Sequence, residues 1–353
     1  MNDSGYNPDY EIVIGITMGE PLGIGPEIIV KALADSNLRR MAKFVIFGTE
    51  EHLAYAADAA EIDPFWGRHQ HEKISRHYPH NVMLADYDDY SIPAWTLGPS
   101  KAGGEASIKF CLDAINAARA GIIDAVVTAP INKISWKMAG SVWPGHTEML
   151  ADICKSPRKA MMFIAGPLKL ALATIHESLF EIRHKFTIGC VYEPIDLLND
   201  TLKKYFGIEN PHIAVAALNP HCGEQGQFGD EEKRIISPAI LMAQEVGINC
   251  SGPYPADTLF LQASQGKFDG VVAMYHDQGM IPVKLLAFRQ AVNITIGLPI
   301  IRTSPAHGTA FDIVGKGIAD ESSMKSAIRV AIEMAHVKKR VGVSPHLGKA
   351  NNK

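Results

Sequence analysis

Short apolar runs rich in β-branched residues alternate along the chain with longer segments of helical periodicity. Apolar positions three and four residues apart predict one-sided helices at 105–120, 230–246 and 323–337, and Pro26 suits the first turn of a helix at 26–34. This alternation is typical of an α/β fold with a largely parallel sheet. We expect strands at the runs 11–16, 43–48, 81–85, 124–128, 169–175, 212–218, 269–275 and 292–296.

The bulk composition excludes several classes of protein. Hydrophobic residues make up 47% and charged residues 20% of the 353 residues, and the net charge is −4, so the chain lacks the basic field of a nucleic-acid-binding protein. No apolar run approaches the ~18 residues of a membrane span, and residues 1–10 lack the features of a secretory signal. The five cysteines are widely spaced without a C-x-x-C pair, which argues against disulfides and favours a cytoplasmic setting.

Three of the predicted strands are each followed by a histidine, namely His176, His221 and His276. Because ligands of open α/β sheets bind at the carboxyl ends of strands, three such histidines indicate a shared site. Neutral imidazole suits Zn²⁺, Fe²⁺, Co²⁺ or Ni²⁺. Spacing alone leaves an equal alternative, in which each histidine only caps a helix or bonds a loop carbonyl. The neighbouring acids either orient these imidazoles or are simple helix-start charges: Glu177, Glu224 and Asp277.

Other polar residues near strand ends suit an anionic ligand. His146 and Thr147 lie at a predicted helix start, where an anion site and a plain cap are equally expected. Lys284, Asn293 and Arg302 combine two cations with an amide, which suits a phosphate or carboxylate, although solvated surface charge is the commoner role of such cations. The segment Gly-Ile-Gly-Pro at 23–26 is not a G-x-G-x-x-G fingerprint and predicts only a tight turn against a ligand.

The motifs around these residues resemble those of the 4-hydroxythreonine-4-phosphate dehydrogenase family, the oxidoreductases of pyridoxal phosphate biosynthesis. The resemblance runs from Thr17 to about Ala335 and rests on the segments Gly145-His-Thr-Glu148, Leu218-Asn-Pro-His-Cys-Gly-Glu224, Pro255-Ala-Asp-Thr-Leu-Phe260, Tyr275-His-Asp-Gln-Gly279 and Val292-Asn-Ile-Thr295. It implies one divalent metal ion (Zn, Mg, Co or Mn) on the histidines His176, His221 and His276. It also implies a homodimer whose active site combines residues of both subunits, with substrate contacts from His146, Thr147, Lys284, Asn293 and Arg302.

A more distant likeness connects residues 307–318 with the cofactor loop of isopropylmalate and isocitrate dehydrogenases. It implies NAD or NADP binding at Gly308, Thr309, Ala310 and Asp312. It also implies their two-subdomain α/β fold, with a central, largely parallel sheet and an inter-domain cleft. No Pro/Gly-rich linker marks a boundary. We expect a first subdomain at 11–130 plus 297–337, a second subdomain with the dimer interface at 131–296, and a flexible tail at 338–353.

The resemblance implies a reaction in which the metal binds a hydroxyl of a phosphorylated hydroxy acid and NAD accepts a hydride from the carbon that bears this hydroxyl; the product then decarboxylates. Lys284 is the candidate for proton transfer, because a lysine near a cation can have a lowered pKa, and Asp257 or Asp277 could share that role.

These features support three hypotheses about function. The first is oxidation of 4-hydroxythreonine 4-phosphate. Cys222 and Gln225 stand where the biosynthetic enzymes tend to have small residues. The segments 229–232 and 281–286 are more similar to a paralogous group that oxidises D-threonate or D-erythronate 4-phosphate to dihydroxyacetone phosphate and CO₂ in sugar-acid catabolism. A phosphometabolite-binding homologue without turnover is the alternative from a different class.

Overall fold

The computed structural model describes residues 11–92 and 97–343, with the side chains of 341–343 left aside. Its internal contacts divide the chain into unit 1, which comprises residues up to Ser156 together with those from Leu298, and unit 2, Pro157–Gly297. Residues 131–156, expected with the second subdomain, therefore pack with the first, since helix α5 (Lys133–Met138) lies against helix α4 (Lys101–Arg119).

Unit 1 is built on a parallel sheet. In sheet order its strands are β3 (Gly67–Gln70), β4 (Val82–Asp86), β2 (Lys43–Gly48), β1 (Val13–Thr17), β5 (Ala125–Thr128) and β12 (Ile301–Pro305). Each strand pair described within it is parallel, and the buried strands β1, β2, β4 and β5 are mostly apolar, as expected for a sheet covered on both faces. The buried strand β12, in contrast, carries Arg302, Thr303 and Ser304.

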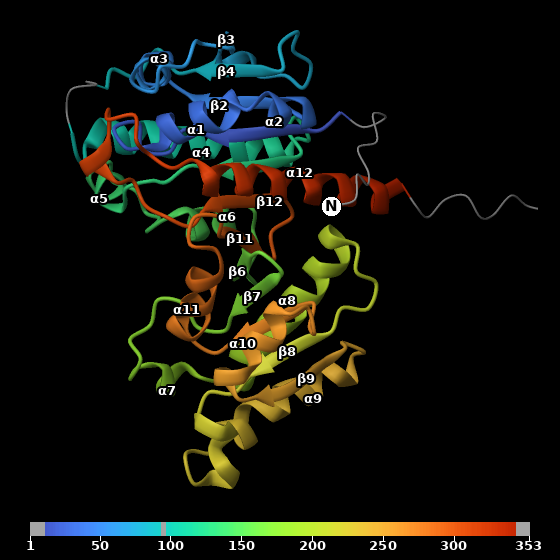
Figure 1. Cartoon of the computed structure of the whole chain (residues 1–353). Coiled ribbons are helices and arrows are strands. Elements are labelled where there is room, and N and C mark those ends of the chain that lie inside the picture. The colour runs from blue at the N-terminus through green and yellow to red at the C-terminus, as the bar shows by residue number, and fades with distance from the viewer. Residues whose placement is uncertain (1–10, 93–96, 344–353) are drawn as a thin grey trace, which may run out of the picture. The chain divides into compact units, whose positions relative to one another are not determined.

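Helices cover the sheet of unit 1, and Figure 1 shows α4 and α12 running along it. Pro26 stands in the first turn of α1, where its missing N–H costs nothing, and Asn132 caps α5 by accepting from two backbone amides. The remaining helical segments of this unit are α1 (Gly25–Ala34), α2 (Ser36–Met41), α3 (Glu50–Ala59), η1 (His71–Lys73), α6 (His146–Ile153), η4 (Phe311–Ile313) and α12 (Ser322–Val343).

Unit 2 has a mixed sheet. Its strand β6 pairs in antiparallel fashion with both of its neighbours, whereas the other described pairs are parallel. In sheet order the strands are β11 (Val292–Ile296), β6 (Ala160–Ala165), β7 (Leu168–Leu172), β10 (Gly270–Ala273), β8 (Ile213–Ala216) and β9 (Cys250–Tyr254). The helical segments are α7 (Ile182–Lys185), α8 (Ile188–Phe206), η2 (Pro220–Gly226), η3 (Glu232–Ile236), α9 (Ser237–Glu245), α10 (Ala256–Ser264) and α11 (His276–Ala287).

The eight predicted strands are confirmed within a few residues, but the sequence pattern does not predict β3, β6, β9 and β12. Strand β6 reads Ala-Met-Met-Phe-Ile-Ala and is poor in β-branched residues, while β9 and β12 contain proline, which normally argues against a strand. The expected tail at 338–353 is wrong in its first part, because α12 continues through Val343; residues 344–353 lie outside the described residues.

No described helix is long and apolar enough to cross a membrane.

Candidate functional site

The three predicted metal ligands all lie at one edge of the sheet of unit 2. Strand β10 pairs in parallel with β7 on one side and with β8 on the other, so the carboxyl ends of these three strands are neighbours. His176 follows β7, His276 begins helix α11 after β10, and His221 follows β8. The expectation that the three histidines share one sheet edge is therefore confirmed.

Two of these histidines lie close together. The ring centroids of His176 and His276 are 5.9 Å apart. The Nδ1 atom of His276 lies 2.7 Å from Oδ1 of Asp277, so this carboxylate can accept the Nδ1 proton and leave Nε2 for another partner. His221 repeats the pattern, with its Nδ1 atom 3.2 Å from Oε2 of Glu224. A carboxylate on the far side of an imidazole is the usual support of a metal-binding histidine.

His221 lies on a backbone segment of unusual conformation. His221, Cys222, Glu224 and Gln225 all have positive φ angles, between 42° and 56°, in the left-handed region that such residues rarely adopt. Strain of this kind persists only where the surroundings hold the backbone in place, and it is concentrated at functional sites.

The buried carboxylate of Glu232 fixes the start of this segment. Its Oε1 atom accepts from the backbone amides of Leu218 and Asn219, at 2.9 and 2.7 Å, and the Asn219 side chain donates to both Glu231 and Glu232. The acidic residues at 231 and 232 therefore hold the loop that presents His221.

The described residues of a single chain contain no cluster of three metal-ligating side chains. The structure thus brings His176 and His276 together, while His221 stands at the same edge without joining them in one ligand set.

Three further candidates belong to unit 2. Lys284 is partly buried on α11, its ammonium group lies 5.1 Å from the ring centre of Phe288, and desolvation by burial lowers its pKa. Asn293, on β11, has an Oδ1 atom that is buried and without a hydrogen-bond partner among the described residues. Asp257 is exposed in the first turn of α10.

The remaining substrate candidates lie in unit 1. Arg302, on β12, is only 3% exposed and donates from Nε and Nη2 to the hydroxyl of Thr128, at 3.1 and 2.7 Å. Burial lowers the pKa of Arg302 to about 10, which still leaves the guanidinium charged at neutral pH. A buried guanidinium beside a hydroxyl can bind an anion such as phosphate.

His146 begins helix α6, followed by Thr147, and its ring lies nearly perpendicular to that of Trp136, with the ring centroids 5.5 Å apart. Burial, followed by the positive charge of Arg302, lowers the pKa of His146 well below its usual value, so the imidazole is neutral. Its Nε2 atom is buried and has no hydrogen-bond partner among the described residues. A neutral ring with an unused nitrogen is suited to a hydrogen bond with a ligand.

Glu20 is a residue that the sequence reasoning did not single out. It follows β1 by three positions, is fully buried, and has no hydrogen-bond partner for either carboxylate oxygen among the described residues. Burial raises the pKa of Glu20 to about 6, although Ser135 and the Leu22 backbone lie near enough to oppose the rise. The available signal was its position directly after the first strand.

The predicted cofactor residues lie in a loop of unit 1 that contacts the start of α1. The amide of Ile24 donates to the carbonyl of Thr309 at 3.0 Å. Ala310 has a left-handed backbone, with φ 41°, and Asp312 lies in η4. A Cβ atom placed on Gly308 would meet nothing within 4 Å. The loop is therefore fixed to α1 at Thr309, while the space beside Gly308 is open.

Comparison with known proteins places the chain among dehydrogenases. The model of the family described as pyridoxal phosphate biosynthetic protein PdxA matches residues 40–331. A 4-hydroxythreonine-4-phosphate dehydrogenase of Desulforapulum autotrophicum is 44% identical over 93% of this chain and 97% of the relative. A D-threonate 4-phosphate dehydrogenase of Cupriavidus necator is 42% identical over 93% and 98%. The crystal structure of a Klebsiella pneumoniae 4-hydroxythreonine-4-phosphate dehydrogenase has a TM-score of 0.84 at 37% identity and covers 94% of this chain and 100% of that one.

Proposed function

We propose that this chain, which belongs to the family of the pyridoxal phosphate biosynthetic protein PdxA, oxidises and decarboxylates 4-hydroxythreonine 4-phosphate to 3-amino-2-oxopropyl phosphate with NAD or NADP as hydride acceptor. The chain is an oxidoreductase that acts on a CH–OH group. The observation that carries the proposal is the pair His176 and His276 at a sheet edge, with Asp277 supporting the second ring.

The imidazoles fit a divalent metal ion. Asp277 and Glu224 bond the Nδ1 atoms of His276 and His221, which leaves each Nε2 atom as the donor to a metal. His176 is the third proposed ligand. A metal bound there would act as a Lewis acid toward the substrate hydroxyl and toward the charge that develops on its oxygen. Zn, Mg, Co and Mn all remain candidates.

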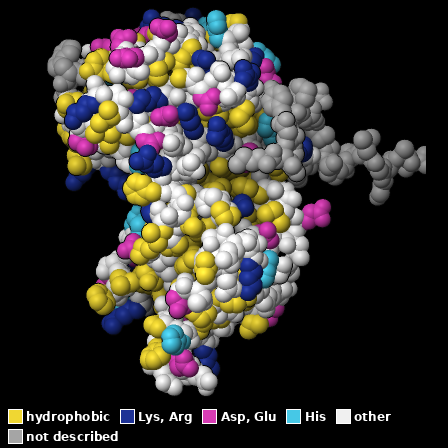
Figure 2. Space-filling model, viewed as in Figure 1, with side chains coloured by type: hydrophobic (Ala, Val, Ile, Leu, Met, Phe, Trp, Pro, Cys, Tyr) yellow, Lys and Arg dark blue, Asp and Glu magenta, His cyan; other side chains and the backbone are white. Residues whose placement is uncertain are grey.

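We propose that the protein works as a homodimer with a shared active site. One chain does not assemble three ligating groups within its described residues, so a second copy completing the set would account for the exposed His221. Helix α11 exposes apolar side chains that a partner could cover: Ile281 is 60%, Leu285 82% and Phe288 71% exposed. Figure 2 shows hydrophobic side chains at the surface over α11. Contiguous apolar surface of this kind marks an interaction site.

The chain's own polar residues supply binding and proton transfer. Arg302, charged and buried, is proposed to bind the substrate phosphate, together with neutral His146 and Thr147. Asn293, with its unused Oδ1 atom, is proposed to orient a hydroxyl or amino group of the substrate. Lys284, whose pKa is lowered, is proposed to move the proton.

The two acidic candidates differ in what they contact. Asp277 is engaged with His276, which favours an orienting role for it. Asp257 is exposed and stays the second candidate for proton transfer.

The alternative substrates are D-threonate and D-erythronate 4-phosphate, which would give dihydroxyacetone phosphate and CO₂. Relatives named as D-threonate 4-phosphate dehydrogenases are 42% identical to this chain, close to the 44% of a relative named for the amino acid substrate. The substrates differ at carbon 2, where one has an amino group and the others a hydroxyl.

A cytoplasmic location is proposed as well. All of the cysteines that the structure describes are free thiols, as a reducing compartment would keep them.

The test is NADH formation from each four-carbon phosphate, with the purified protein treated with chelator and then supplied with Zn²⁺, Mg²⁺, Co²⁺ or Mn²⁺. We expect turnover with 4-hydroxythreonine 4-phosphate only after metal is restored. Faster turnover with threonate or erythronate 4-phosphate would assign the alternative reaction. Binding of these compounds without NADH formation under any condition would identify a non-catalytic phosphometabolite-binding homologue.

A further inference from the structure

Arg302 and Thr128 face the same side of the sheet of unit 1. Strand β12 pairs in parallel with β5 so that Arg302 lies opposite Val126, and Thr128 follows two positions later on the same face. The next residue of β12, Thr303, faces the other side, where its hydroxyl donates to the carbonyl of Ala327 in α12. Arg302 and Thr128 therefore face away from α12.

The hydroxyl of Thr128 holds one edge of the Arg302 guanidinium. Its Oγ1 atom accepts from both Nε and Nη2 of Arg302, at 3.1 and 2.7 Å. The two bonds share one acceptor and lie along one edge of a planar group, so they fix the plane of the guanidinium as well as its position. Thr128 is 1% and Arg302 is 3% exposed, so water competes little for these bonds.

Thr128 orients this cation without neutralising it. A hydroxyl carries no charge, whereas a carboxylate in the same place would compensate the guanidinium and raise its pKa. The pKa of Arg302 is instead lowered, by burial, to about 10. Its positive charge also reaches His146 of α6, whose pKa is lowered by burial and then by this charge. A buried cation that keeps its charge in a fixed orientation is suited to bind an anion.

We propose that Thr128 is a positioning residue for substrate binding, which holds Arg302 in the one orientation that meets the phosphate of the substrate. Thr128 acts through Arg302 and does not contact the substrate. The proposal rests on the proposed function, because it assumes that Arg302 binds this phosphate. Without the hydroxyl, the long side chain of Arg302 would lose its single geometry, and the incoming phosphate would have to order it at a cost in affinity.

Thr17 provides a matched comparison within the same sheet. It lies directly opposite Thr128 on the neighbouring strand β1 and therefore faces the same side. It is also 1% exposed, but its Oγ1 atom has no hydrogen-bond partner among the described residues. Thr17→Val and Thr128→Val thus remove the same group from the same layer of the sheet, and of the two only Thr128→Val removes an acceptor from Arg302.

The test is binding of inorganic phosphate to the full-length protein by titration calorimetry, together with steady-state kinetics on the phosphorylated substrate. Thr128→Val should weaken phosphate binding and raise the KM for this substrate by about 3- to 10-fold, as for one lost hydrogen bond. The kcat and the KM for NAD should stay within about twofold of wild type, since the loss concerns binding alone. Thr128→Ser, which keeps the hydroxyl, should bind phosphate as wild type does, and so should Thr17→Val.

A double-mutant cycle separates positioning from packing. In the Arg302→Met background, Thr128→Val should weaken phosphate binding no further and raise the KM no further, because the hydroxyl then has no guanidinium to hold. In the wild-type background, Thr128→Val should also lower the melting temperature, since it takes this acceptor from two buried N–H groups, and adding Arg302→Met should reverse that loss. If Thr128→Val fails to fold, Thr128→Cys takes its place, because its thiol is a weak acceptor of similar size.

The outcomes separate this inference from the proposed function. Phosphate binding by Thr128→Val equal to that of wild type would overturn the inference even if the enzyme made NADH. An equal loss in Thr17→Val, or a further loss in the Arg302→Met background, would also overturn it, because the effect would then come from packing of the sheet. Weaker phosphate binding by Thr128→Val but not by Thr17→Val, together with no NADH from any four-carbon phosphate, would support the role of Thr128 and refute the proposed reaction.

Discussion

The candidate polar residues of the two units differ in their exposure to solvent. In unit 1 the anion-binding candidate Arg302 is 3% exposed and fixed against Thr128. In unit 2 the side chains of His276 and His221 are 42% and 68% exposed, and each is braced by its own carboxylate. The candidate cation of unit 1 is thus buried and fixed within one chain, whereas the candidate histidines of unit 2 are exposed and form no three-ligand set among the described residues.

Substitutions of the candidate residues should therefore have different effects in unit 1 and in unit 2. A buried guanidinium has lost its water and gains strongly from an anion, so its loss should appear in substrate binding. An exposed imidazole gains little from its surroundings until a metal arrives, so its loss should appear in metal content and turnover with little effect on folding.

The largest effect is expected for His276→Ala. Loss of one of three proposed metal ligands should lower turnover by about 10³-fold or more, because a Lewis acid supplies several kcal/mol to the reaction. Metal bound per chain, measured by atomic emission after dialysis, should fall in parallel, and the melting temperature should stay within a few degrees of wild type.

The control for this prediction is His184→Ala, in the same unit but on α7, where the histidine contacts Arg183. Full metal content in His276→Ala would remove this residue from the ligand set. It would also contradict the proposal that unit 2 binds the metal.

A smaller effect is expected for Arg302→Met, which removes the charge and keeps much of the buried volume. The KM for the phosphorylated substrate should rise by about 10- to 100-fold, the range for a lost charged hydrogen bond, while the KM for NAD and the metal content stay unchanged. Steady-state kinetics with each substrate varied separately measures this.

The exposed Arg234→Met serves as the control for Arg302→Met. If the KM for the phosphorylated substrate were unchanged in Arg302→Met, the buried cation of unit 1 would be structural, and the contrast between the units would have to be abandoned.

The sequence allowed the sheet edge to be predicted because it follows a local rule. A histidine directly after a buried strand is visible in the chain, and the pairing of β10 with β7 and β8 then brings His176 and His276 together. The left-handed backbone at 221–225 is not visible in the sequence, and neither is the bonding of the preceding amides, Leu218 and Asn219, to the carboxylate of Glu232. The position of Glu20 after β1 is visible in the sequence, but its burial is not, since Gly103 of α4 and Ser135 of α5 lie against its carboxylate.

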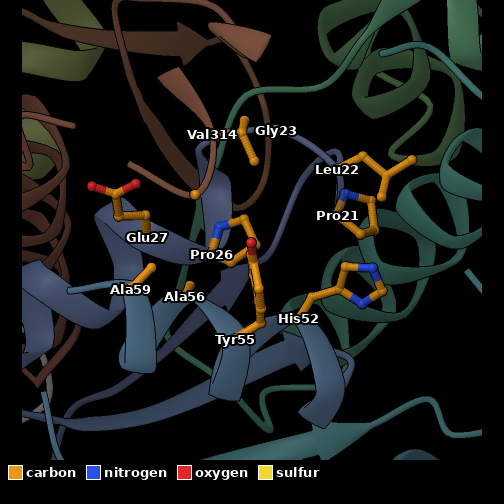
Figure 3. A pocket seen from close by; sticks show the side chains of 11 residues that line it. Pro21, Leu22, Gly23, Pro26, Glu27, His52, Tyr55, Ala56, Ala59 and Val314 are labelled. Atoms are coloured by element: carbon orange, nitrogen blue, oxygen red, sulfur yellow. The ribbon is translucent and has the colours of Figure 1, made fainter. Parts of the chain in front are cut away.

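The sequence pattern also did not indicate a pocket in unit 1 that His52, Tyr55, Ala56 and Ala59 of helix α3 help to line (Figure 3). The spacing of 52, 55, 56 and 59 is that of any one-sided helix, and nothing local distinguishes it from a core-facing stripe. The stripe lines a pocket only because the turn at Val314 and Gly315, more than 250 residues later in the chain, forms the opposite wall. Local patterns thus predicted the elements and their ends, and long-range packing decided which polar atoms were left without partners.

The smallest expected effect concerns Glu20 and the pH dependence of stability. Burial raises its folded-state pKa from 4.5 to about 6, so the folded protein holds this proton more tightly than the unfolded chain. The contribution of this group to stability is therefore fully present below pH 4.5 and is lost as the pH rises through 6. At pH 8 the ionised carboxyl costs about 2 kcal/mol relative to pH 4, from a shift of roughly 1.5 pKa units.

Glu20→Gln should remove this dependence. The free energy of unfolding of the variant minus that of wild type should be about 2 kcal/mol higher at pH 8 than at pH 4, measured by urea denaturation at both values. Glu209→Gln is the matched control, because Glu209 is exposed in unit 2 and its substitution should show no comparable change. If the free energies of unfolding of wild type and Glu20→Gln differed by the same amount at both pH values, the buried carboxyl would have hydrogen-bond partners in solution. The polar groups of unit 1 would then be less fully desolvated than the comparison with unit 2 assumes.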